Sequence, residues 1–109
     1  MKIVYYDLET TNLRPLTGQS GVEIVQIGAI CKHTRTKSQR TFNHYLIPTC
    51  GISPGATQVH GLTKEWLNDR YYLYDYDDVS PIDDGLVKFV DFLIEQQEFA
   101  CEEIVMVRF

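Results

Sequence analysis

Three strand-like segments follow one another in the first 47 residues, and they limit the folds open to this chain more than any other feature. Residues 2–9 are rich in β-branched and aromatic side chains, residues 23–32 form a nearly continuous apolar run, and residues 39–47 alternate between apolar and polar. A continuous apolar run is typical of a strand that is covered on both faces. The short connection at 33–38 makes the third strand antiparallel to the second, so the pattern predicts an antiparallel sheet.

Two short helices are expected after this sheet. Ser53 precedes Pro54, an arrangement that favours a helix N-cap with proline at the first helical position. This helix is expected to end at about His60, because Gly61 follows it. Thr63 then caps a second short helix, which we expect to cover residues 64–69.

The second half of the chain predicts one long helix and one more strand. Residues 71–78 mix aromatic and acidic side chains without a clear period, so we interpret them as a loop or an irregular edge. Residues 83–98 are expected to form a helix whose apolar face carries Leu86, Phe89, Val90 and Leu93. Residues 104–109 read as a final strand. The order of elements predicts an α/β fold in which a three-stranded antiparallel meander is followed by helices and a fourth strand.

Composition bounds the class of protein. A chain of 109 residues with 44% apolar residues suits a single small domain with its own core. The net charge of −5 argues against a strongly basic nucleic-acid surface, although an acidic metal site is compatible with it. No stretch approaches the length of a membrane span, and no secretion signal is recognisable. Three scattered cysteines predict reduced thiols in an intracellular protein of the cytoplasm or nucleus, and not a zinc site.

The candidate chemistry lies at the end of the first strand, where Asp7 and Glu9 are two residues apart. Residues i and i+2 of a strand point to the same face, so Tyr5, Asp7 and Glu9 are expected on one face and Val4 on the other. The two carboxylates would lie about 7 Å apart along the strand. Such a pair can share one hard cation, because Mg²⁺ prefers carboxylate and water oxygens. A pair of solvated acids is the alternative for so short a pattern.

The sequence around this pair resembles a known family. The segment 7–13, Asp-Leu-Glu-Thr-Thr-Asn-Leu, resembles the first motif of the DEDD-type 3′–5′ exonucleases, the proofreading-subunit type with a ribonuclease H-like fold. Residues 24–29 resemble the second strand of these enzymes, and residues 56–63, Ala-Thr-Gln-Val-His-Gly-Leu-Thr, resemble a segment before their first long helix. The three matches come in the family's order and extend over most of the chain.

The resemblance implies roles for particular residues. Asp7 and Glu9 would be the catalytic, metal-binding acids, with Asp7 bridging two Mg²⁺ or Mn²⁺ ions and Glu9 binding one of them. Thr10 would hydrogen-bond the terminal nucleotide, and Leu13 would pack against its base. His60 is interpreted as a capping or substrate-adjacent residue and not as the catalytic base.

The chain departs from the family at its other end. The family carries four metal-binding acids and a His or Tyr that positions the attacking water. Residues 104–107 resemble the strand that precedes the third acid, but Arg108 and Phe109 stand where its polar motif is expected. We therefore expect a single partial exonuclease domain over residues 1–109, incomplete at the C-terminus, with weak or single metal binding.

Other polar and aromatic residues have simpler readings. Four basic residues around the expected turn suggest a solvated hairpin end, or else an edge that contacts phosphates: Lys32, Arg35, Lys37 and Arg40. His33 and His44 are expected to be structural or exposed, and Trp66 is expected to be a packing residue. The tyrosines of residues 71–76 could stack on bases or cover the core.

Two functions follow as hypotheses. The first is a metal-dependent 3′–5′ exonuclease that hydrolyses phosphodiester bonds at DNA or RNA 3′ ends, inactive or weak as this short chain. The second is a non-catalytic nucleic-acid or protein binding module on a truncated exonuclease fold. The expected partners are single-stranded 3′ ends, with self-association or a protein partner at an exposed sheet edge. A third reading, in which Asp7 and Glu9 pair by coincidence in a structural domain, ranks last.

Overall fold

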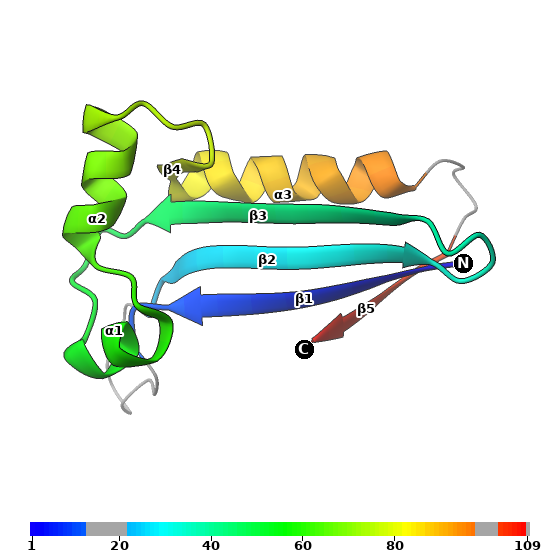
Figure 1. Ribbon diagram of the computed structural model, residues 1–109, viewed down its shortest axis with the longest axis horizontal. Helices are drawn as coiled ribbons and strands as arrows, with labels where there is room; N and C mark the ends of the chain where they lie inside the picture. The colour runs from blue at the N-terminus through cyan, green and yellow to red at the C-terminus, as the bar shows by residue number, and fades with distance from the viewer. Residues whose placement is uncertain (13–21, 98–102, 109) are drawn as a thin grey trace.

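The computed structural model describes residues 1–12, 22–97 and 103–108. The described chain forms strands, α-helices and one π-helical turn (Figure 1), in this order: β1 (Lys2–Thr10), β2 (Ile24–His33), β3 (Gln39–Ile47), α1 (Pro54–His60), α2 (Lys64–Asn68), η1 (Asp69–Leu73), β4 (Val79–Pro81), α3 (Ile82–Gln96) and β5 (Ile104–Arg108).

One mixed sheet organises the fold, with the strand order β4-β3-β2-β1-β5. The pairs β1–β2 and β2–β3 are antiparallel, whereas β4 and β5 run parallel to their neighbours β3 and β1. Helix α3 runs along one face of the sheet, and α1 and α2 lie at the end where β1 and β3 finish (Figure 1). The predicted meander is therefore confirmed, and the predicted final strand does pair with β1.

The short strand β4 is absent from the sequence-based expectation. It has only three residues, Val79–Pro81, and it follows directly on the segment interpreted as a loop. A strand this short shows no period of its own, and it exists because it pairs with β3 across more than 30 residues of chain. Within residues 71–78, the start is helical, because the η1 turn extends α2 as far as Leu73.

The caps predicted for α1 and α2 are confirmed. The Ser53 side chain accepts a hydrogen bond from the Ala56 backbone N–H, and Gly61 ends α1 in the left-handed conformation at φ 76°. The Thr63 side chain accepts from the Trp66 N–H at the start of α2. Both helices thus begin where a side-chain oxygen satisfies a free backbone N–H, and α1 ends where the Gly61 N–H bonds to the Thr57 carbonyl.

Two clusters of buried side chains hold the layers together. One lies between the sheet and α3 and contains Val4, Ala29, Cys31 and Phe92. The other lies where α2 meets the end of the sheet and contains Val25, Leu62, Leu67 and Val79. Val4 of β1 lies in the first cluster and so faces α3. Asp7 is three residues further along the strand, so it lies on the opposite face of the sheet, away from α3. We call this the open face.

The predicted apolar face of α3 is half wrong. Phe89 and Leu93 do pack against the first cluster, but Leu86 is 38% exposed and Val90 is 51% exposed. The helix carries further exposed apolar residues, so its periodicity does not determine which side is buried. The rotation is set by the buried Gly85, where the helix backbone comes close to Leu46 of β3.

His44 is a buried core residue, in agreement with its structural reading. Its Nε2 lies 2.8 Å from the Ser80 Oγ, and the Ser80 hydroxyl donates to the Pro81 carbonyl. With its proton committed to Pro81, the Ser80 oxygen accepts from His44 Nε2–H, which fixes the neutral tautomer. Burial, assisted by the charge of Lys88, holds the pKa of His44 below 6.5, although Asp78 and Asp77 oppose the shift.

This lowered pKa predicts a stability loss in mild acid. At a pH between the folded and the unfolded pKa of His44, the unfolded chain binds more protons than the folded chain. The contribution of neutral His44 to stability is therefore complete above the unfolded pKa and is lost as the pH falls through the folded pKa. We expect the free energy of unfolding to fall as the pH decreases below 6.5, by at most about 1.4 kcal/mol per pH unit for one proton. Urea titrations across this range should show a smaller slope for His44→Gln, and an unchanged slope would contradict the assignment.

Candidate active site

Asp7 and Glu9 lie on the open face at the end of β1, as their spacing predicts. Asp7 is exposed, and its Oδ1 accepts a hydrogen bond of 3.0 Å from the Leu8 backbone N–H. In the β1–β2 register, Asp7 is opposite Gly28 and Glu9 is opposite Gln26. Residues opposite one another share a face, so these four positions form one patch on the sheet.

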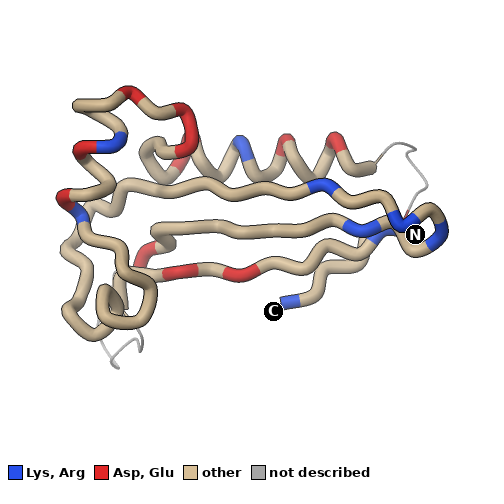
Figure 2. The backbone as a smooth tube through the Cα atoms, viewed as in Figure 1, with Lys and Arg blue, Asp and Glu red and all other residues tan. Residues whose placement is uncertain are grey.

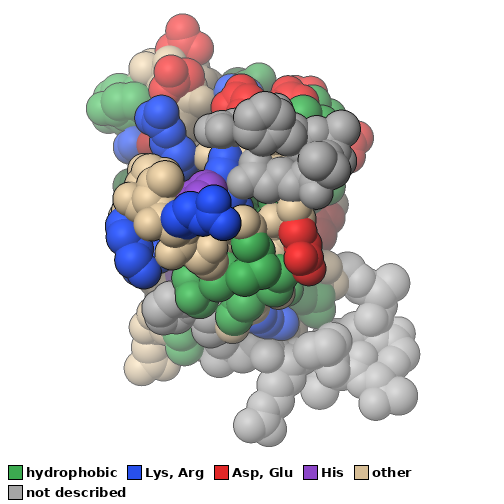
Figure 3. Space-filling view, turned by 90° about the vertical axis from the view of Figure 1, so that its right-hand side faces the viewer, with side chains coloured by type: hydrophobic (Ala, Val, Ile, Leu, Met, Phe, Trp, Pro, Cys, Tyr) green, Lys and Arg blue, Asp and Glu red, His purple; other side chains and the backbone are tan. Residues whose placement is uncertain are grey.

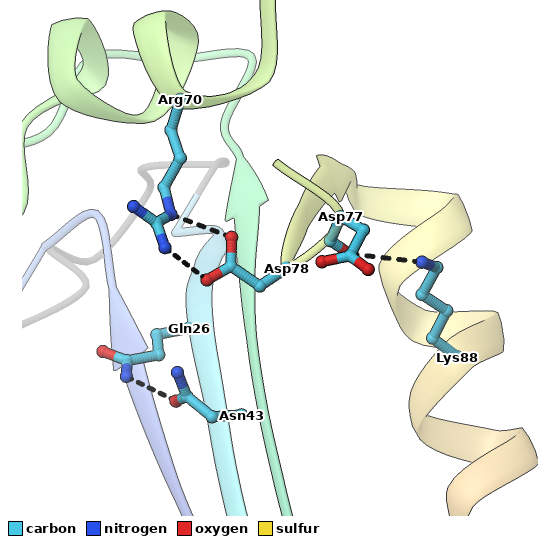
Figure 4. Close-up of polar contacts among 6 residues, drawn as sticks. All are labelled: Gln26, Asn43, Arg70, Asp77, Asp78 and Lys88. Atoms are coloured by element: carbon cyan, nitrogen blue, oxygen red, sulfur yellow. Dashed lines mark hydrogen bonds and ion pairs between the residues drawn. The ribbon is translucent and has the colours of Figure 1, made fainter. Parts of the chain in front are cut away.

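The sheet surface beside Asp7 and Glu9 is accessible and polar. A side chain at Gly28 would meet only the Asn43 Oδ1, at 4.0 Å, so the glycine leaves free space next to Asp7. The Gln26 Nε2 donates to the Asn43 Oδ1 at 2.7 Å, which places an amide pair on the same face (Figure 4). A hollow of about 330 Å³ borders Asp7 and Gly28. Water and a ligand therefore have access to the carboxylates.

The chain just after the acids is held by neighbouring segments. A bulge separates Glu9 from Thr10, and the Thr10 hydroxyl donates to the Asn12 carbonyl at 2.7 Å. The Thr11 N–H donates to the Glu23 carbonyl at 2.9 Å, and the Ser53 N–H donates to the Thr11 carbonyl at 2.8 Å. The end of β1 is thus fixed to the starts of β2 and α1. Leu13 lies outside the described residues.

His60 connects α1 to this end of β1. The Leu62 N–H donates to His60 Nδ1 at 3.0 Å, so that nitrogen carries no proton. The proton is therefore on Nε2, which donates to the Thr10 carbonyl at 3.0 Å. Both ring nitrogens are engaged with backbone groups. The His60 ring therefore links the end of α1 to the Thr10 backbone.

Removing the His60 side chain should loosen this connection. We expect His60→Ala to lower the free energy of unfolding by about 1–2 kcal/mol, since two partly buried hydrogen bonds contribute about 1 kcal/mol each. Gln58→Ala, an exposed position on the same helix, is the matched control and should change stability by less than about 0.5 kcal/mol. Urea unfolding of both variants measures the difference, and equal stabilities would exclude the connecting role.

Glu23 is a structural acid next to the site that the sequence pattern did not single out. Its carboxylate accepts hydrogen bonds from the Thr49 backbone N–H at 2.6 Å, the Thr49 hydroxyl, and the Cys50 N–H at 3.4 Å. Burial raises the pKa of Glu23, but these donors outweigh it and bring the pKa below 4.5. Glu23 therefore holds the segment that leads into α1. In the sequence, Glu23 is the first residue of the apolar run 23–32, and that position does not indicate these contacts.

An aromatic cluster surrounds Arg70 of η1, next to Tyr45 of β3. The guanidinium lies 4.1 Å from the Tyr76 ring centroid and 5.0 Å from that of Trp66. It also donates two hydrogen bonds to Asp78, of 2.8 and 2.6 Å, and lowers the pKa of that carboxyl (Figure 4). Trp66, expected to be a packing residue, contacts Tyr45 edge-on but remains 41% exposed.

The donor set fits a weakly held divalent cation. Within the described residues, no group of three or more His, Cys, Asp or Glu side chains could hold a metal ion. Asp7 and Glu9 remain as a pair beside free space. Mg²⁺ commonly binds through one or two carboxylates together with waters and substrate phosphates, so two acids facing solvent are compatible with such an ion.

Comparison with known proteins identifies the family. The family model of the RNase T exonucleases matches residues 4–104. The chain therefore belongs to this exonuclease family. Exonucleases of the DEDD type generally use divalent metal ions, in keeping with the acidic pair. In the described part of the chain, no helix is both long and apolar enough to span a membrane.

Curated relatives and solved structures agree with this assignment. The DNA polymerase III subunit epsilon of Rickettsia felis is 33% identical over 70 residues, which cover 64% of this chain and 29% of the relative. That of Pasteurella multocida is 32% identical over 68 residues, 62% of this chain and 27% of the relative. The chain therefore spans less than a third of the length of these curated relatives.

Solved exonuclease structures share the fold. The nuclease domain of 3′hExo, a DEDDh family member bound to rAMP, has a TM-score of 0.72 at 16% identity, over 98% of this chain and 50% of that one. A 3′-exonuclease solved in the context of histone mRNA stem-loop recognition has a TM-score of 0.71 at 16% identity, over 98% of this chain and 45% of its own. The predicted ribonuclease H-like fold is confirmed.

Proposed function

We propose that the chain takes part in metal-dependent hydrolysis of phosphodiester bonds at the 3′ ends of DNA or RNA. The observation that carries this proposal is the pair Asp7 and Glu9 on the open face, beside the space left by Gly28. Membership of the exonuclease family and the likeness to 3′-exonuclease structures support it.

Each residue of the site has a role in this proposal. Asp7 and Glu9 would hold Mg²⁺ or Mn²⁺, which when bound supplies a Lewis acid that polarises the phosphoryl group and activates water. Thr10 would hydrogen-bond the terminal nucleotide, and Leu13 would contact its base. His60 would keep the Thr10 backbone in place through its Nε2–H bond. With two carboxylates as ligands, metal affinity and activity of this chain alone are expected to be low.

The direct test is nucleotide release from end-labelled oligonucleotides. The chain is incubated with 5′-labelled single-stranded DNA or RNA and with Mg²⁺, Mn²⁺ or EDTA. Stepwise shortening from the 3′ end that depends on the metal ion supports the proposal, and the two substrates report the preference for DNA or RNA. A folded chain that leaves both substrates intact at high Mn²⁺ would contradict catalysis by this chain on its own.

A non-catalytic binding module is the second candidate, and one observation favours it. In the order of the described strands, β5 is an edge strand, and its Met106 and Val107 are 43% and 38% exposed. Such an edge can pair with a protein strand or with a second copy of the chain. Sedimentation of the chain at increasing concentration tests self-association, since a constant monomer mass would exclude a stable dimer.

A further inference from the structure

The charges of this chain are separated along the sheet. Within the sheet, acidic residues lie toward the end where β1 finishes and basic residues lie at the opposite end, around the β2–β3 hairpin, while further acidic residues lie along α3 (Figure 2). Viewed end-on, that end of the molecule shows a group of Lys and Arg side chains (Figure 3). Four of its residues form no ion pair with any described carboxylate, and we call them the basic hairpin: Lys32, Arg35, Lys37 and Arg40. Their charge is available to a ligand even though the chain is acidic overall.

A hollow lies beside the basic hairpin, on the open face of the sheet. It has a volume of about 290 Å³, and its lining includes Ile3, Tyr5, Lys32 and Lys37. In the register, Ile3 is opposite Lys32, and Lys32 is opposite Gln39, so these side chains share the face of Asp7. The Lys32 Nζ also lies 5.9 Å from the centroid of the Tyr5 ring. The hollow thus combines positive charge with an aromatic surface.

The hollow beside the basic hairpin and the acidic pair Asp7 and Glu9 lie along the same face of β1. Asp7 and Ile3 are four residues apart on β1, which is about 13 Å along a strand, and Tyr5 lies between them on the same face. This distance is about four nucleotides at the 3.4 Å rise of a stacked strand, and fewer if the strand is extended. Proteins that bind single strands commonly combine such a positively charged surface with aromatic side chains on which bases stack.

The hairpin turn holds the backbone of Lys37 in a defined conformation. The His33 N–H donates to the Ser38 carbonyl at 3.0 Å, and the Lys37 N–H donates to the His33 carbonyl at 3.1 Å. Lys37 itself has φ 63°, a left-handed conformation that is uncommon for a residue other than glycine or asparagine. The lysine is therefore carried on a preformed turn, so the backbone of the turn needs little ordering when a ligand binds.

We propose that this hollow binds the backbone phosphates of a single nucleic-acid strand whose 3′ end lies at Asp7 and Glu9. Lys32 and Lys37 contact phosphates a few nucleotides before the 3′ end, and Tyr5 supports a base between the two sites. This inference rests on the proposed function for the position of the 3′ end. The binding of the phosphodiester backbone itself needs no catalysis, and it applies to DNA and RNA alike.

Binding of an eight-nucleotide single strand in EDTA tests the proposal without hydrolysis. The double variant Lys32→Gln, Lys37→Asn removes both charges, and asparagine keeps the left-handed turn accessible. The control is Lys64→Gln, Lys88→Gln, which removes two charges from the helices α2 and α3. Fluorescence anisotropy is measured at several salt concentrations with DNA and with RNA.

The expected result is a weaker complex for the hairpin variant and a smaller salt dependence. The slope of log K against log salt should fall by about 1.4, since each phosphate contact on a single strand contributes about 0.7. The control should keep the slope of the unmodified chain. A hairpin variant that binds like the control, or an unmodified chain that does not bind the strand, would overturn the proposal. Equal melting temperatures of the two variants exclude unfolding as the cause.

Neutral phosphates locate the contact along the strand. Methylphosphonate groups placed singly at each position of the oligonucleotide should weaken binding most within about four nucleotides of the 3′ end, and only when Lys32 and Lys37 are present. If methylphosphonate groups weaken binding equally at all positions, the proposed path of the strand from Asp7 to the basic hairpin is wrong. The nucleotide-release assay separates this inference from the proposed function: if the unmodified chain binds the strand through Lys32 and Lys37 but releases no nucleotide at high Mn²⁺, catalysis by this chain fails and the phosphate site stands.

Discussion

Replacing Asp7 with asparagine is expected to lower Mn²⁺-dependent nucleotide release by at least about 100-fold. Substitutions of residues that only support metal ligands commonly cost 10–100-fold, so loss of a ligand itself should cost no less. The substitution removes one of two carboxylates on the open face and keeps the size of the side chain. Asp7 is exposed, so the fold should be retained.

Two measurements separate loss of the metal site from other causes. Asp91→Asn, an exposed acid on α3, removes the same charge away from the site and should retain the activity of the unmodified chain. Calorimetric titration with Mn²⁺ should show weak binding that Asp7→Asn abolishes. If the titration is the same for both proteins, Asp7 is not a metal ligand, and the proposed function loses its main support.

Local chemistry explains why much of the fold could be predicted from the sequence. Ser53, Gly61 and Thr63 determine helix ends through groups within a few residues, so the caps could be read directly. The period of two along β1 likewise placed Asp7 and Glu9 on one face. These features depend on neighbours in the chain, and no knowledge of the tertiary structure was needed to infer them.

The features that could not be predicted depend on contacts between distant segments. Strand β4 exists because it pairs with β3, and its three residues carry no pattern. The space beside Asp7 depends on the β1–β2 register that brings Gly28 opposite, about 20 residues further on. The His60 bond to the Thr10 carbonyl joins residues 50 apart. The sequence could suggest the acids of the site, but the surroundings of those acids arise from register and packing.

The buried side of α3 shows the same limit at a single residue. Apolar side chains occur on several sides of this helix, so its pattern is compatible with more than one rotation about the helix axis. Gly85 selects one of them, because a residue without a side chain lets the helix approach β3 closely. A lone glycine within a helical pattern is a weak signal of close packing, and here it was the informative one.

The Gly85→Ala substitution should therefore be strongly destabilising, although alanine is the better helix former. An added Cβ would lie 1.9 Å from the Leu46 Cδ2, 3.1 Å from the His44 Cδ2 and 3.2 Å from the Ser80 Oγ. Leu46 is fully buried, so it cannot move aside into solvent. We expect a loss of about 3 kcal/mol, at the upper end for overpacking, after a gain of about 1 kcal/mol in helix propensity.

A double-variant cycle identifies the contact responsible. Leu46→Ala alone should cost about 2–5 kcal/mol because it leaves a cavity in the core. In the chain that carries Leu46→Ala, adding Gly85→Ala should cost much less than it does alone, because the new methyl group enters that cavity. Urea unfolding of the two single variants and the double variant gives the coupling free energy. Additive losses would show that α3 does not meet β3 at Gly85, and the packing that supports the sheet would need another explanation.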